Sequence, residues 1–399
     1  MTNVKVVIGA NFGDEGKGLM TDYFCHKATS KGEDCVVVMS NGGAQRGHTV
    51  TSPDGTRHVF HHFGSGTFVG AKTYCVCDYI LNPMTFVKEY FELMQLGYTP
   101  TNMIIESSCR WSTPFDMIIN QILEAARGNA KHGSCGMGIW ETAVRYQRIP
   151  KLPQLAEFNA WPMVRKLEFL KDHRDTYLIE RLKENGVVDI PSEWHEIVYS
   201  ESLLTHFIDD VRFMIEHTTP ALLQPLNLFK NIVFENGQGL LLDQDLTFYG
   251  NNTTPSSTGW NNVARTINRN FDNSDQIDME VCYVTRTYMT RHGVGRFETE
   301  CDKTLINASM FDETNITNPF QDNLRYGELI IPNLVTRTSA DFESVKLNTL
   351  YNVNMTASVA VTHTNEHEID YSRVRDKLIS NVYTSDSRTR DSVKVFTEF

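Results

Sequence analysis

A glycine-rich loop near the N-terminus holds the residue types best suited to chemistry. The stretch GANFGDEGKG, residues 9–18, follows the apolar run VKVVI and precedes a helical pattern. Backbone N–H groups in such a strand–loop–helix turn bind phosphate, and a lysine such as Lys17 adds a positive charge. An acid beside phosphate needs its own purpose, and Asp14 or Glu15 could bind magnesium or act as a general base. The loop is therefore a candidate for phosphate chemistry.

This loop departs from the ordinary P-loop at two positions. The Walker pattern requires Gly where Asn11 stands, and Ser or Thr where Gly18 stands. The chain also lacks an NKxD guanine motif. A GTPase-like switch protein is therefore disfavoured.

A second loop with catalytic residue types follows the next predicted strand. The segment MSNGGAQRGHTV, residues 39–50, ends in Gly47, His48 and Thr49. One histidine after a strand is more often structural than catalytic. Here two glycine-rich loops both follow strands, and such loops meet at one edge of a parallel sheet. The spacing therefore predicts a single site built from both loops.

The elements that must position these loops are short apolar strands and the helices between them. Most of the strand-like runs are almost continuously apolar, which is typical of strands covered on both faces of a parallel sheet. The predicted strands are 4–8, 34–40, 74–80, 102–107, 231–236, 280–285 and 357–362, and residues 83–97 are a predicted helix. Residues 151–225 carry charged helical patterns without a strong strand, and no Gly/Pro/Ser linker brackets them. We therefore expect a single α/β domain over residues 1–399, with a mainly parallel central sheet and a helical elaboration at 151–225.

The bulk composition favours a protein that acts on small molecules. The 399 residues are 41% hydrophobic and 22% charged, with a net charge of −12 and a pI near 5.6. Nucleic acid and anionic membranes require a basic surface, so neither partner is expected. No apolar run approaches the about 18 residues of a membrane span. The N-terminus is a core strand rather than a signal peptide, and the cysteines form no CxxC pair, so we expect reduced thiols in a cytoplasmic protein.

A series of motifs along the chain resembles the adenylosuccinate synthetase family. The first two are GDEGKG and the second loop, which is similar to the family's GGxNAGHT. The others are HHFGSG (61–66), HGSCGMGI (132–139), ENGQGLLLDQD (235–245), YMTRHGVGRFETE (288–300) and RYGEL (325–329). Each motif is modest alone, but their shared order is highly specific. The resemblance implies a magnesium-dependent ligase that joins L-aspartate to C6 of a purine nucleotide through a 6-phosphoryl intermediate.

The resemblance also implies roles for the matching positions. Asp14 would remove the N1 proton of the purine and lie near magnesium, with the Gly47 carbonyl as another metal ligand. His48 would stabilise the phosphoryl transfer and protonate the leaving phosphate, while Lys17 would contact phosphate. The implied contacts to the nucleoside triphosphate are Gly13, Glu15, Gly16, Gly18, Thr49, Thr362 and Asn365. The implied contacts to the acceptor and to aspartate are Gln45, Ser134, Cys135, Arg145, Gln238, Thr299 and Arg325.

Two implied arginine sites depend on weaker matches. The family is a homodimer in which one arginine completes the partner's acceptor phosphate site, and both Arg145 and Arg148 lie near the matching position. The family's aspartate-binding loop TTGRxRR is reduced here to NPFQDNLR, residues 318–325. Only Arg325 is a convincing partner for aspartate, with an ordinary surface arginine as the alternative.

Two departures from the family predict a changed donor base site. Where the family has TKLD, whose aspartate reads guanine, this chain has THTN at 362–365, and Glu366 is the alternative acceptor through a shifted register. The final loop TSDSRTRDS, residues 384–392, lacks the family's SxGP. A site without its buried acceptor discriminates poorly for guanine, so we expect ATP or dATP rather than GTP as the donor.

Together with the altered second loop, in which Gln45 and Arg46 replace Asn-Ala, these departures resemble the phage branch of the family. Its members, the 2-aminoadenylosuccinate synthetases, use dGMP and support DNA that contains 2,6-diaminopurine. The best-known members replace the loop aspartate by a smaller residue, whereas this chain retains Asp14. We expect dGMP as the acceptor, in the host cytoplasm if the chain is of phage origin. The ordinary reaction with IMP and GTP is the alternative.

Two hypotheses from other classes remain for comparison. A metal-dependent hydrolase could use His58, His61 and His62, but adjacent residues such as His61 and His62 point to opposite faces of a strand. A nucleotide-binding protein without activity is the second hypothesis. The presence together of Asp14, His48 and Lys17 argues against it.

Overall fold

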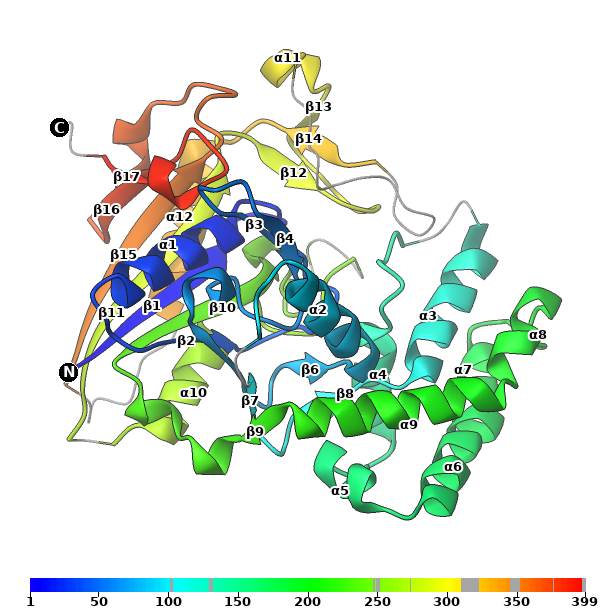
Figure 1. The fold of residues 1–399 in the computed structure, drawn as a ribbon. Coiled ribbons are helices and arrows are strands. Elements are labelled where there is room, and N and C mark those ends of the chain that lie inside the picture. The colour runs from blue at the N-terminus through cyan, green and yellow to red at the C-terminus, as the bar shows by residue number, and fades with distance from the viewer. Residues whose placement is uncertain are drawn as a thin grey trace.

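One large, mainly parallel sheet organises the molecule (Figure 1). The computed structural model describes residues 1–100, 103–128, 132–246, 248, 252–272, 274–309, 323–344, 352–375 and 377–396. Within these ranges, ten strands pair in the order β17-β16-β15-β11-β1-β10-β2-β5-β7-β9. All neighbours are parallel except β16 and β17, which confirms the predicted α/β class.

The strands of the central sheet match most of the predicted runs. They are β1 (Thr2–Gly9), β2 (Cys35–Met39), β5 (Lys72–Cys75), β7 (Met103–Ile105), β9 (Thr218–Pro220), β10 (Asn231–Gly239), β11 (Gln276–Arg286), β15 (Asn352–Thr362), β16 (Ile379–Thr384) and β17 (Lys394–Val395). The strand predicted at 74–80 is wrong beyond Cys75, because the chain turns there and the N–H of Tyr79 donates to the Val76 carbonyl. The edge strand β9, which lies in the segment predicted to be helical, was not predicted.

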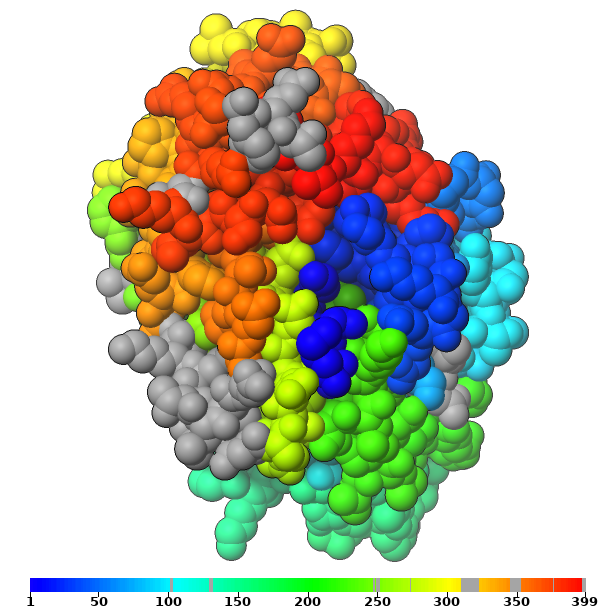
Figure 2. All heavy atoms as spheres, turned by 90° about the vertical axis from the view of Figure 1, so that its left-hand side faces the viewer, coloured from blue at the N-terminus to red at the C-terminus, as the bar shows by residue number. Residues whose placement is uncertain are grey.

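The first strand of the chain lies inside the sheet, between two strands from much later in the sequence. Val6 of β1 is in register with Phe234 of β10 on one side and with Val281 of β11 on the other. Figure 2 shows the blue N-terminus between the green and the yellow-green segments that carry these neighbours. Because β2 pairs with the other edge of β10, the carboxyl ends of β1, β10 and β2 are adjacent.

Helices cover both faces of the sheet. Val7 and Val37 pack on the face covered by α1 (Lys17–Thr29), α2 (Pro83–Gln95) and α9 (Glu201–Glu216). Val6 and Val38 pack on the opposite face, against α10 (Asn261–Asn270) and α12 (Ile331–Ser344). Alternate residues of one strand therefore enter two separate cores, which explains why the strands are apolar throughout.

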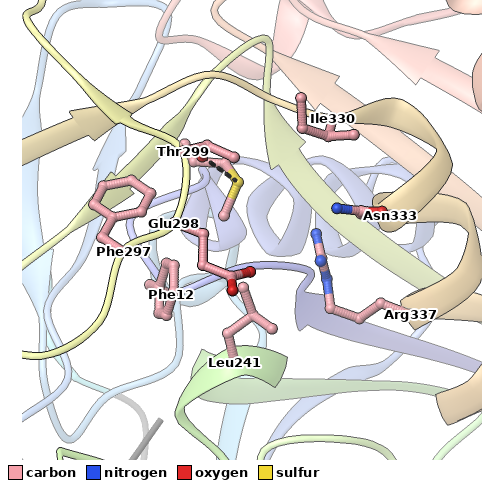
Figure 3. Close-up of a pocket in the computed structure, with 9 residues that line it drawn as sticks. Phe12, Leu241, Phe297, Glu298, Thr299, Ile330, Asn333 and Arg337 are labelled. Atoms are coloured by element: carbon pink, nitrogen blue, oxygen red, sulfur yellow. Dashed lines mark hydrogen bonds between the residues drawn. The ribbon is translucent and has the colours of Figure 1, made fainter. Parts of the chain in front are cut away.

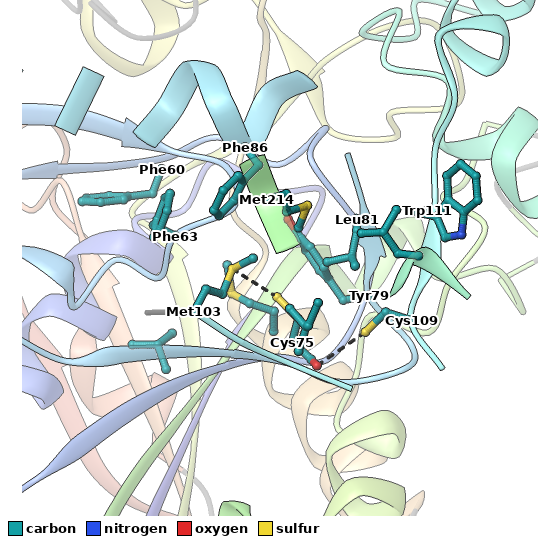
Figure 4. Packing of buried hydrophobic residues seen from close by; sticks show 14 of the residues in the cluster. Phe60, Phe63, Cys75, Tyr79, Leu81, Phe86, Met103, Cys109, Trp111 and Met214 are labelled. Atoms are coloured by element: carbon teal, nitrogen blue, oxygen red, sulfur yellow. Dashed lines mark hydrogen bonds between the residues drawn. The ribbon is translucent and has the colours of Figure 1, made fainter. Parts of the chain in front are cut away.

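Aromatic packing joins α2 to the loop at residues 61–66 (Figure 4). The rings of Phe63 and Phe86 stack with centroids 5.3 Å apart, and Phe86 is fully buried. The helix begins where the sequence favours it: Asn82 caps the N–H of Thr85, and Pro83 occupies the first turn. Replacing a buried phenylalanine such as Phe86 by alanine costs about 3–5 kcal/mol of stability.

The segment 151–225 is built mainly of helices. They are α5 (Leu155–Ala160), α6 (Met163–Asp172), a π-helical turn (His173–Leu178), α7 (Ile179–Glu184), α8 (Ser192–Val198) and α9. The fully buried residues Leu170, Leu178 and Val211 join these helices to the same core as α2. In the described part of the chain, no helix has the length and apolar character needed to cross a membrane.

Smaller sheets and further helices complete the described part of the chain. β3 (His48–Thr51) pairs with β4 (Arg57–Phe60), and β6 (Ile80–Leu81) pairs with β8 (Arg110–Trp111). β14 (Arg325–Gly327) lies between β12 (Met289–Arg291) and β13 (Glu300–Cys301). Among the described residues, the remaining α-helices are α3 (Pro114–Arg127), α4 (Ile139–Arg148) and α11 (Thr304–Asn307).

Candidate active site

The loop after β1 is closed around its own glutamate. The carboxylate of Glu15 accepts hydrogen bonds from the N–H groups of Asn11 (2.9 Å) and Gly13 (2.8 Å), and Nζ of Lys17 lies 3.0 Å from its other oxygen. Both side chains of the Glu15–Lys17 pair are only 2% exposed. The N–H of Gly13, which is predicted to contact phosphate, thus donates its hydrogen bond to Glu15. The amides at the start of α1 have no earlier helical carbonyl to bond, and helix N-termini of this kind bind phosphate.

Asp14 projects from this loop toward a second segment. Its backbone has φ of +60°, and its carbonyl accepts a 2.5 Å hydrogen bond from Nε of Arg286. Its carboxylate lies 3.4 Å from Nε2 of His292, and the side chain is 29% exposed. Asp14 is therefore more accessible than its neighbour Glu15, as a residue that acts on a substrate must be.

Two predicted threonines flank the start of α1. Oγ1 of Thr362 donates to the Glu15 carbonyl at 2.7 Å, and a Cβ added at Gly16 would lie 3.0 Å from the Thr362 side chain. A Cβ added at Gly18 would lie 2.7 Å from the Thr49 carbonyl. Both contacts leave no room for a side chain. The structure thus brings the loops after β1, β2 and β15 together, as expected for a nucleotide site.

His48 is held by a buried carboxylate that was not predicted. Nδ1 of His48 and a guanidinium nitrogen of Arg46 each lie 2.7 Å from an oxygen of Glu235, and Ser65 donates its backbone N–H (3.1 Å) and its hydroxyl to the same carboxylate. Burial, aided by Arg46, lowers the pKa of His48 to about 4 despite the opposing effect of Glu235. Burial alone would raise the pKa of Glu235, but Arg46 and His48 bring it down to about 2. The carboxylate therefore fixes the imidazole with Nδ1 facing inward.

The three residues that surround His48 all lie in sequence motifs, although the sequence analysis predicts no role for them. Glu235 begins the ENGQG motif, Ser65 lies in HHFGSG, and Arg46 was seen only as a departure from the family pattern. Gln45, the predicted acceptor contact, is half-buried, and its amide nitrogen lies 3.0 Å from a Cβ added at Gly42.

Gln238 lies beside the first loop, at the end of β10. Its backbone has φ of +66°, and its Cα lies 3.9 Å from a Cβ added at Gly13. The next residue, Gly239, allows a close approach, because a Cβ there would lie 2.3 Å from the Asn11 carbonyl. The structure therefore brings Gln238 to the edge that carries Asp14.

The predicted acceptor loop, residues 132–138, contacts the segment that faces Asp14. Oγ of Ser134 accepts a 2.9 Å hydrogen bond from Asn120, and burial raises the pKa of the Cys135 thiol. A Cβ added at Gly133 would lie 2.7 Å from the Cα of Gly293. Through this contact, the loop holding Ser134 and the loop holding His292 lie side by side.

The position of Arg145 contradicts its predicted role. Arg145 is fully buried; its Nε lies 2.9 Å from Asp116, and its NH2 group donates to the Trp111 carbonyl at 2.6 Å. Asp116 also closes the capping box of α3. Breaking a buried ion pair leaves an uncompensated charge, so this guanidinium is a structural group of the chain interior. Arg148, the alternative, is 41% exposed and pairs with Glu184 at 2.7 Å.

Arg325 is engaged within the chain. Its Nε lies 2.8 Å from Glu300, and its NH1 group donates to the carbonyls of Gly293 (3.0 Å) and Gly295 (2.9 Å). The rest of the predicted aspartate-binding loop, 318–322, lies outside the described residues.

Thr299 lies in a small pocket between α12 and the β12–β13 segment (Figure 3). The pocket has apolar walls that include Phe12 and Phe297, and Arg337 lines it from α12. Arg337 also donates to the Ala10 carbonyl at 2.6 Å and to the side chain of Asn11. Thr299 is therefore linked by this pocket to the base of the first loop.

In the loop predicted to contact the donor base, the carboxylate of Glu366 is bound by another side chain of the protein. The hydroxyl of Tyr288 donates to the carboxylate of Glu366 and lies 3.0 Å from Arg286. Asn365 is exposed, and the neighbouring Thr364 N–H donates to the Ser385 carbonyl at 3.1 Å. The loops at 362–366 and 384–392 are thus joined, and Glu366 is already bound.

The donor set fits a magnesium ion of the kind predicted. Mg²⁺ is commonly bound by one or two protein oxygens together with substrate phosphates. The Asp14 carboxylate is partly exposed and Gly47 is exposed, so their oxygens can supply that set. Clusters of three or more His, Cys, Asp or Glu side chains suited to a metal are absent from the described residues. The hydrolase hypothesis also fails at its histidines, because His62 is fully buried and its Nε2 accepts from the Asn82 N–H.

Comparisons with solved structures agree on the fold. The chain superposes on a fully ligated adenylosuccinate synthetase from Plasmodium falciparum with a TM-score of 0.67 at 14% identity, covering 99% of this chain and 100% of that one. It also superposes on the succinoaminodeoxyadenylate synthetase of cyanophage S-2L, which was solved with dGMP and with dATP as an energy donor. That match has a TM-score of 0.59 at 15% identity and covers 99% and 95% of the two chains.

Sequence comparisons identify the family. The adenylosuccinate synthetase of Microcystis aeruginosa is 30% identical over 306 residues, or 76% of this chain, and that of a Nostoc species is 29% identical over 303 residues, or 75%. The chain spans 63% of the length of these curated relatives. The family model for adenylosuccinate synthetase matches residues 6–318, which is well over half of the chain. This chain therefore belongs to the adenylosuccinate synthetase family.

Proposed function

We propose that this chain is a magnesium-dependent carbon–nitrogen ligase. It joins L-aspartate to C6 of a purine nucleoside monophosphate, and a nucleoside triphosphate drives the reaction through a 6-phosphoryl intermediate. The observation that carries the proposal is the meeting of three groups at one sheet edge. They are the accessible Asp14 carboxylate, His48 fixed by Glu235, and the N-terminus of α1 with Thr49 and Thr362 beside it.

The geometry suits a two-step reaction. A purine lactam resists amination because its O6 is a poor leaving group. Asp14 takes the proton from N1, and the resulting charge on O6 attacks the γ-phosphorus while the bond to the nucleoside diphosphate breaks. The aspartate amine then attacks C6 and the C6–O6 bond breaks. The neutral imidazole of His48 takes the proton that the amine loses and passes it to the leaving phosphate. General-base and electrostatic contributions of this kind are each worth about 10²–10⁴-fold in rate.

Metal and phosphate contacts have distinct sources in the proposal. Asp14 and Gly47 would hold Mg²⁺, which neutralises charge on the phosphates when bound. The start of α1, with Gly16 and Gly18, binds the triphosphate through its N–H groups. Lys17 contributes positive charge from its pair with Glu15, which itself holds the loop closed.

For the substrates, we favour dGMP with ATP or dATP, giving 2-amino-2′-deoxyadenylosuccinate, the nucleoside diphosphate and phosphate. The support for the donor is that THTN lacks the guanine-reading carboxylate and that Glu366, its possible replacement, is bound to Tyr288. The likeness to the cyanophage enzyme bound to dGMP and dATP supports the same choice. The ordinary reaction of IMP with GTP is the second candidate, favoured by the retained Asp14 and by the curated relatives.

We also propose that the enzyme acts as a homodimer in the cytoplasm, which would be the host's if the chain is of phage origin. With Arg145 in the interior, Arg148 is the arginine that would reach the neighbouring acceptor phosphate. Arg148 is partly exposed and its partner Glu184 is at the surface, so it can exchange that partner at little cost.

A substrate matrix tests the proposal. IMP, dIMP, GMP and dGMP are each combined with ATP, dATP or GTP in the presence of aspartate and magnesium, and succinylated products are detected by mass. Turnover of dGMP with ATP or dATP, and little of IMP, is expected. Turnover of IMP with GTP would establish the second candidate instead, and no product in any combination would reject the ligase.

A further inference from the structure

Arg325 contacts a loop rather than an open space. Its Nε lies 2.8 Å from the Glu300 carboxylate, and its NH2 group donates to the same carboxylate. Its NH1 group donates to the carbonyls of Gly293 (3.0 Å) and Gly295 (2.9 Å). A planar guanidinium makes such a set of bonds in one fixed geometry, which a lysine cannot reproduce. The side chain thus ties β13 and β14 to the loop that follows β12.

That loop has a conformation that needs to be held. Gly293 has φ of +69° and Gly295 has φ of +124°, both outside the range that other residues adopt readily. A Cβ at Gly295 would lie 2.3 Å from the guanidinium of Arg291, and Arg291 donates to the Arg296 carbonyl at 2.5 Å. Arg291 and Arg325 are directly paired across β12 and β14, so two arginines close the loop from its base.

The same loop touches both halves of the candidate site. On one side Gly293 meets Gly133 of the predicted acceptor loop, where a Cβ would be only 2.7 Å away. On the other side Nε2 of His292 lies 3.4 Å from the Asp14 carboxylate. A shift of residues 292–295 would therefore move the acceptor loop and the surroundings of Asp14 together.

We infer that Arg325, with Glu300, is a positioning residue for the acceptor nucleotide and not a ligand of aspartate. The pair holds the 292–295 loop in place, and this loop in turn fixes the position of the predicted acceptor loop relative to Asp14. This inference rests on the proposed function, and it corrects the role predicted for Arg325 from the sequence.

The burial of the pair fits a role in positioning more than in stability. The side chains of Arg325 and Glu300 are 24% and 44% exposed. Ion pairs this exposed contribute little to folding. Loss of Arg325 should therefore leave a folded protein whose site is misaligned, and a misplacement of about 1 Å can reduce a rate by about 10²-fold.

The test compares kinetic constants in Arg325→Ala, Arg325→Lys and the control Arg296→Ala. Arg296 is a matched control because it is an exposed arginine of the same segment, paired with Glu298 at 2.5 Å. In Arg325→Ala, we expect kcat/KM for the acceptor nucleotide to fall by about 10–10²-fold and KM for aspartate to stay within about twofold. Arg325→Lys should recover only part of the loss, and Arg296→Ala should behave as wild type.

Several outcomes overturn the inference. A larger change for aspartate than for the acceptor would return Arg325 to aspartate binding, and unchanged acceptor constants would remove its positioning role. Should Arg325→Ala fail to fold, Glu300→Gln removes the same charge pair with less disturbance and should lower kcat/KM for the acceptor while sparing KM for aspartate. Unchanged acceptor constants in Glu300→Gln would overturn the inference.

A binding experiment separates this inference from the proposed function. Titration of dGMP and IMP into wild type and Arg325→Ala measures nucleotide affinity without turnover. Absence of product from wild type rejects the ligase, whereas equal nucleotide affinity in the two proteins rejects the positioning role.

Discussion

The two sides of the candidate active site are held by ion pairs of opposite character. On the side of His48, the Glu235 side chain is fully buried, and Arg46 and His48 lie 2.7 Å from it. On the side of the 292–295 loop, Arg325 and Glu300 are 24% and 44% exposed. Losing one partner of a buried pair is costly, whereas exposed pairs contribute little to stability. The proposed proton donor is therefore part of the folded core, while the acceptor side is positioned by a pair that contributes little to stability.

The largest effect that sharpens this comparison is on turnover. Asp14→Asn removes the proposed base while keeping a residue that tolerates positive φ. We expect turnover to fall by about 10²–10⁴-fold. The melting temperature should stay close to that of wild type, because the side chain is partly exposed.

Product formation and thermal unfolding are both measured for Asp14→Asn, so that an effect on catalysis is distinguished from an effect on folding. Asp14→Ala is a useful second variant, since alanine at positive φ costs about 1–2 kcal/mol and should be less stable than Asp14→Asn. Near-normal turnover in Asp14→Asn would remove Asp14 from the mechanism.

The next effect is on stability. Glu235→Ala leaves Arg46 without its buried partner and should cost about 3–5 kcal/mol in the free energy of unfolding. Glu300→Ala removes the partly exposed partner of Arg325 and should cost less than about 1 kcal/mol. Urea unfolding of both variants beside wild type makes the comparison, and equal losses would show that the two sides are held alike.

The smallest effect is a dependence of stability on pH. Burial lowers the pKa of His62 to about 3 and that of His173 to about 4, so both are neutral when folded near pH 6. The unfolded chain binds these protons near pH 6.5, so stability is full above that value and declines as the pH falls toward 4. Between pH 7 and 6 the expected loss is about 0.7 kcal/mol for each such histidine.

Urea unfolding at pH 7 and pH 6 measures this loss of unfolding free energy. The loss should be smaller by about 0.7 kcal/mol in His173→Gln, because one buried histidine is removed. Glu235 acts in the same direction but lower, because its folded pKa of about 2 affects stability only below about pH 4.5. A free energy of unfolding that is flat between pH 7 and 6 would contradict the burial of these imidazoles as neutral groups.

The elements that carry the candidate catalytic loops could be predicted because their signals are local. An apolar run followed by a glycine-rich loop marks β1 and β2, and parallel strands bring their carboxyl ends to one edge. The same reasoning predicted the helix at 83–97, which begins at Pro83 with Asn82 as its cap. The short edge strand β9 was not predicted, because three residues are too few to show an alternating or continuous apolar pattern.

Side-chain partners could not be predicted because they are distant in sequence. Arg46 and Glu235 are 189 residues apart, so the charge that fixes His48 is invisible to any local pattern. Arg145 has the right spacing for a partner-facing residue, but Asp116, 29 residues before it, draws it into the interior. The capture of the Gly13 amide by Glu15 is local, yet it depends on a loop conformation that the residue types alone do not specify.

The central place of β1 has a consequence for how the protein is made. Both strands that flank it come late in the chain, β10 at 231–239 and β11 at 276–286. The ribosome therefore releases the apolar strand Thr2–Gly9 long before either of its hydrogen-bonding neighbours exists. Unpaired apolar strands in nascent chains are prone to aggregation, and non-local pairing is slow. The strand that precedes the candidate catalytic loop is thus synthesised long before the two neighbours that complete its hydrogen bonding.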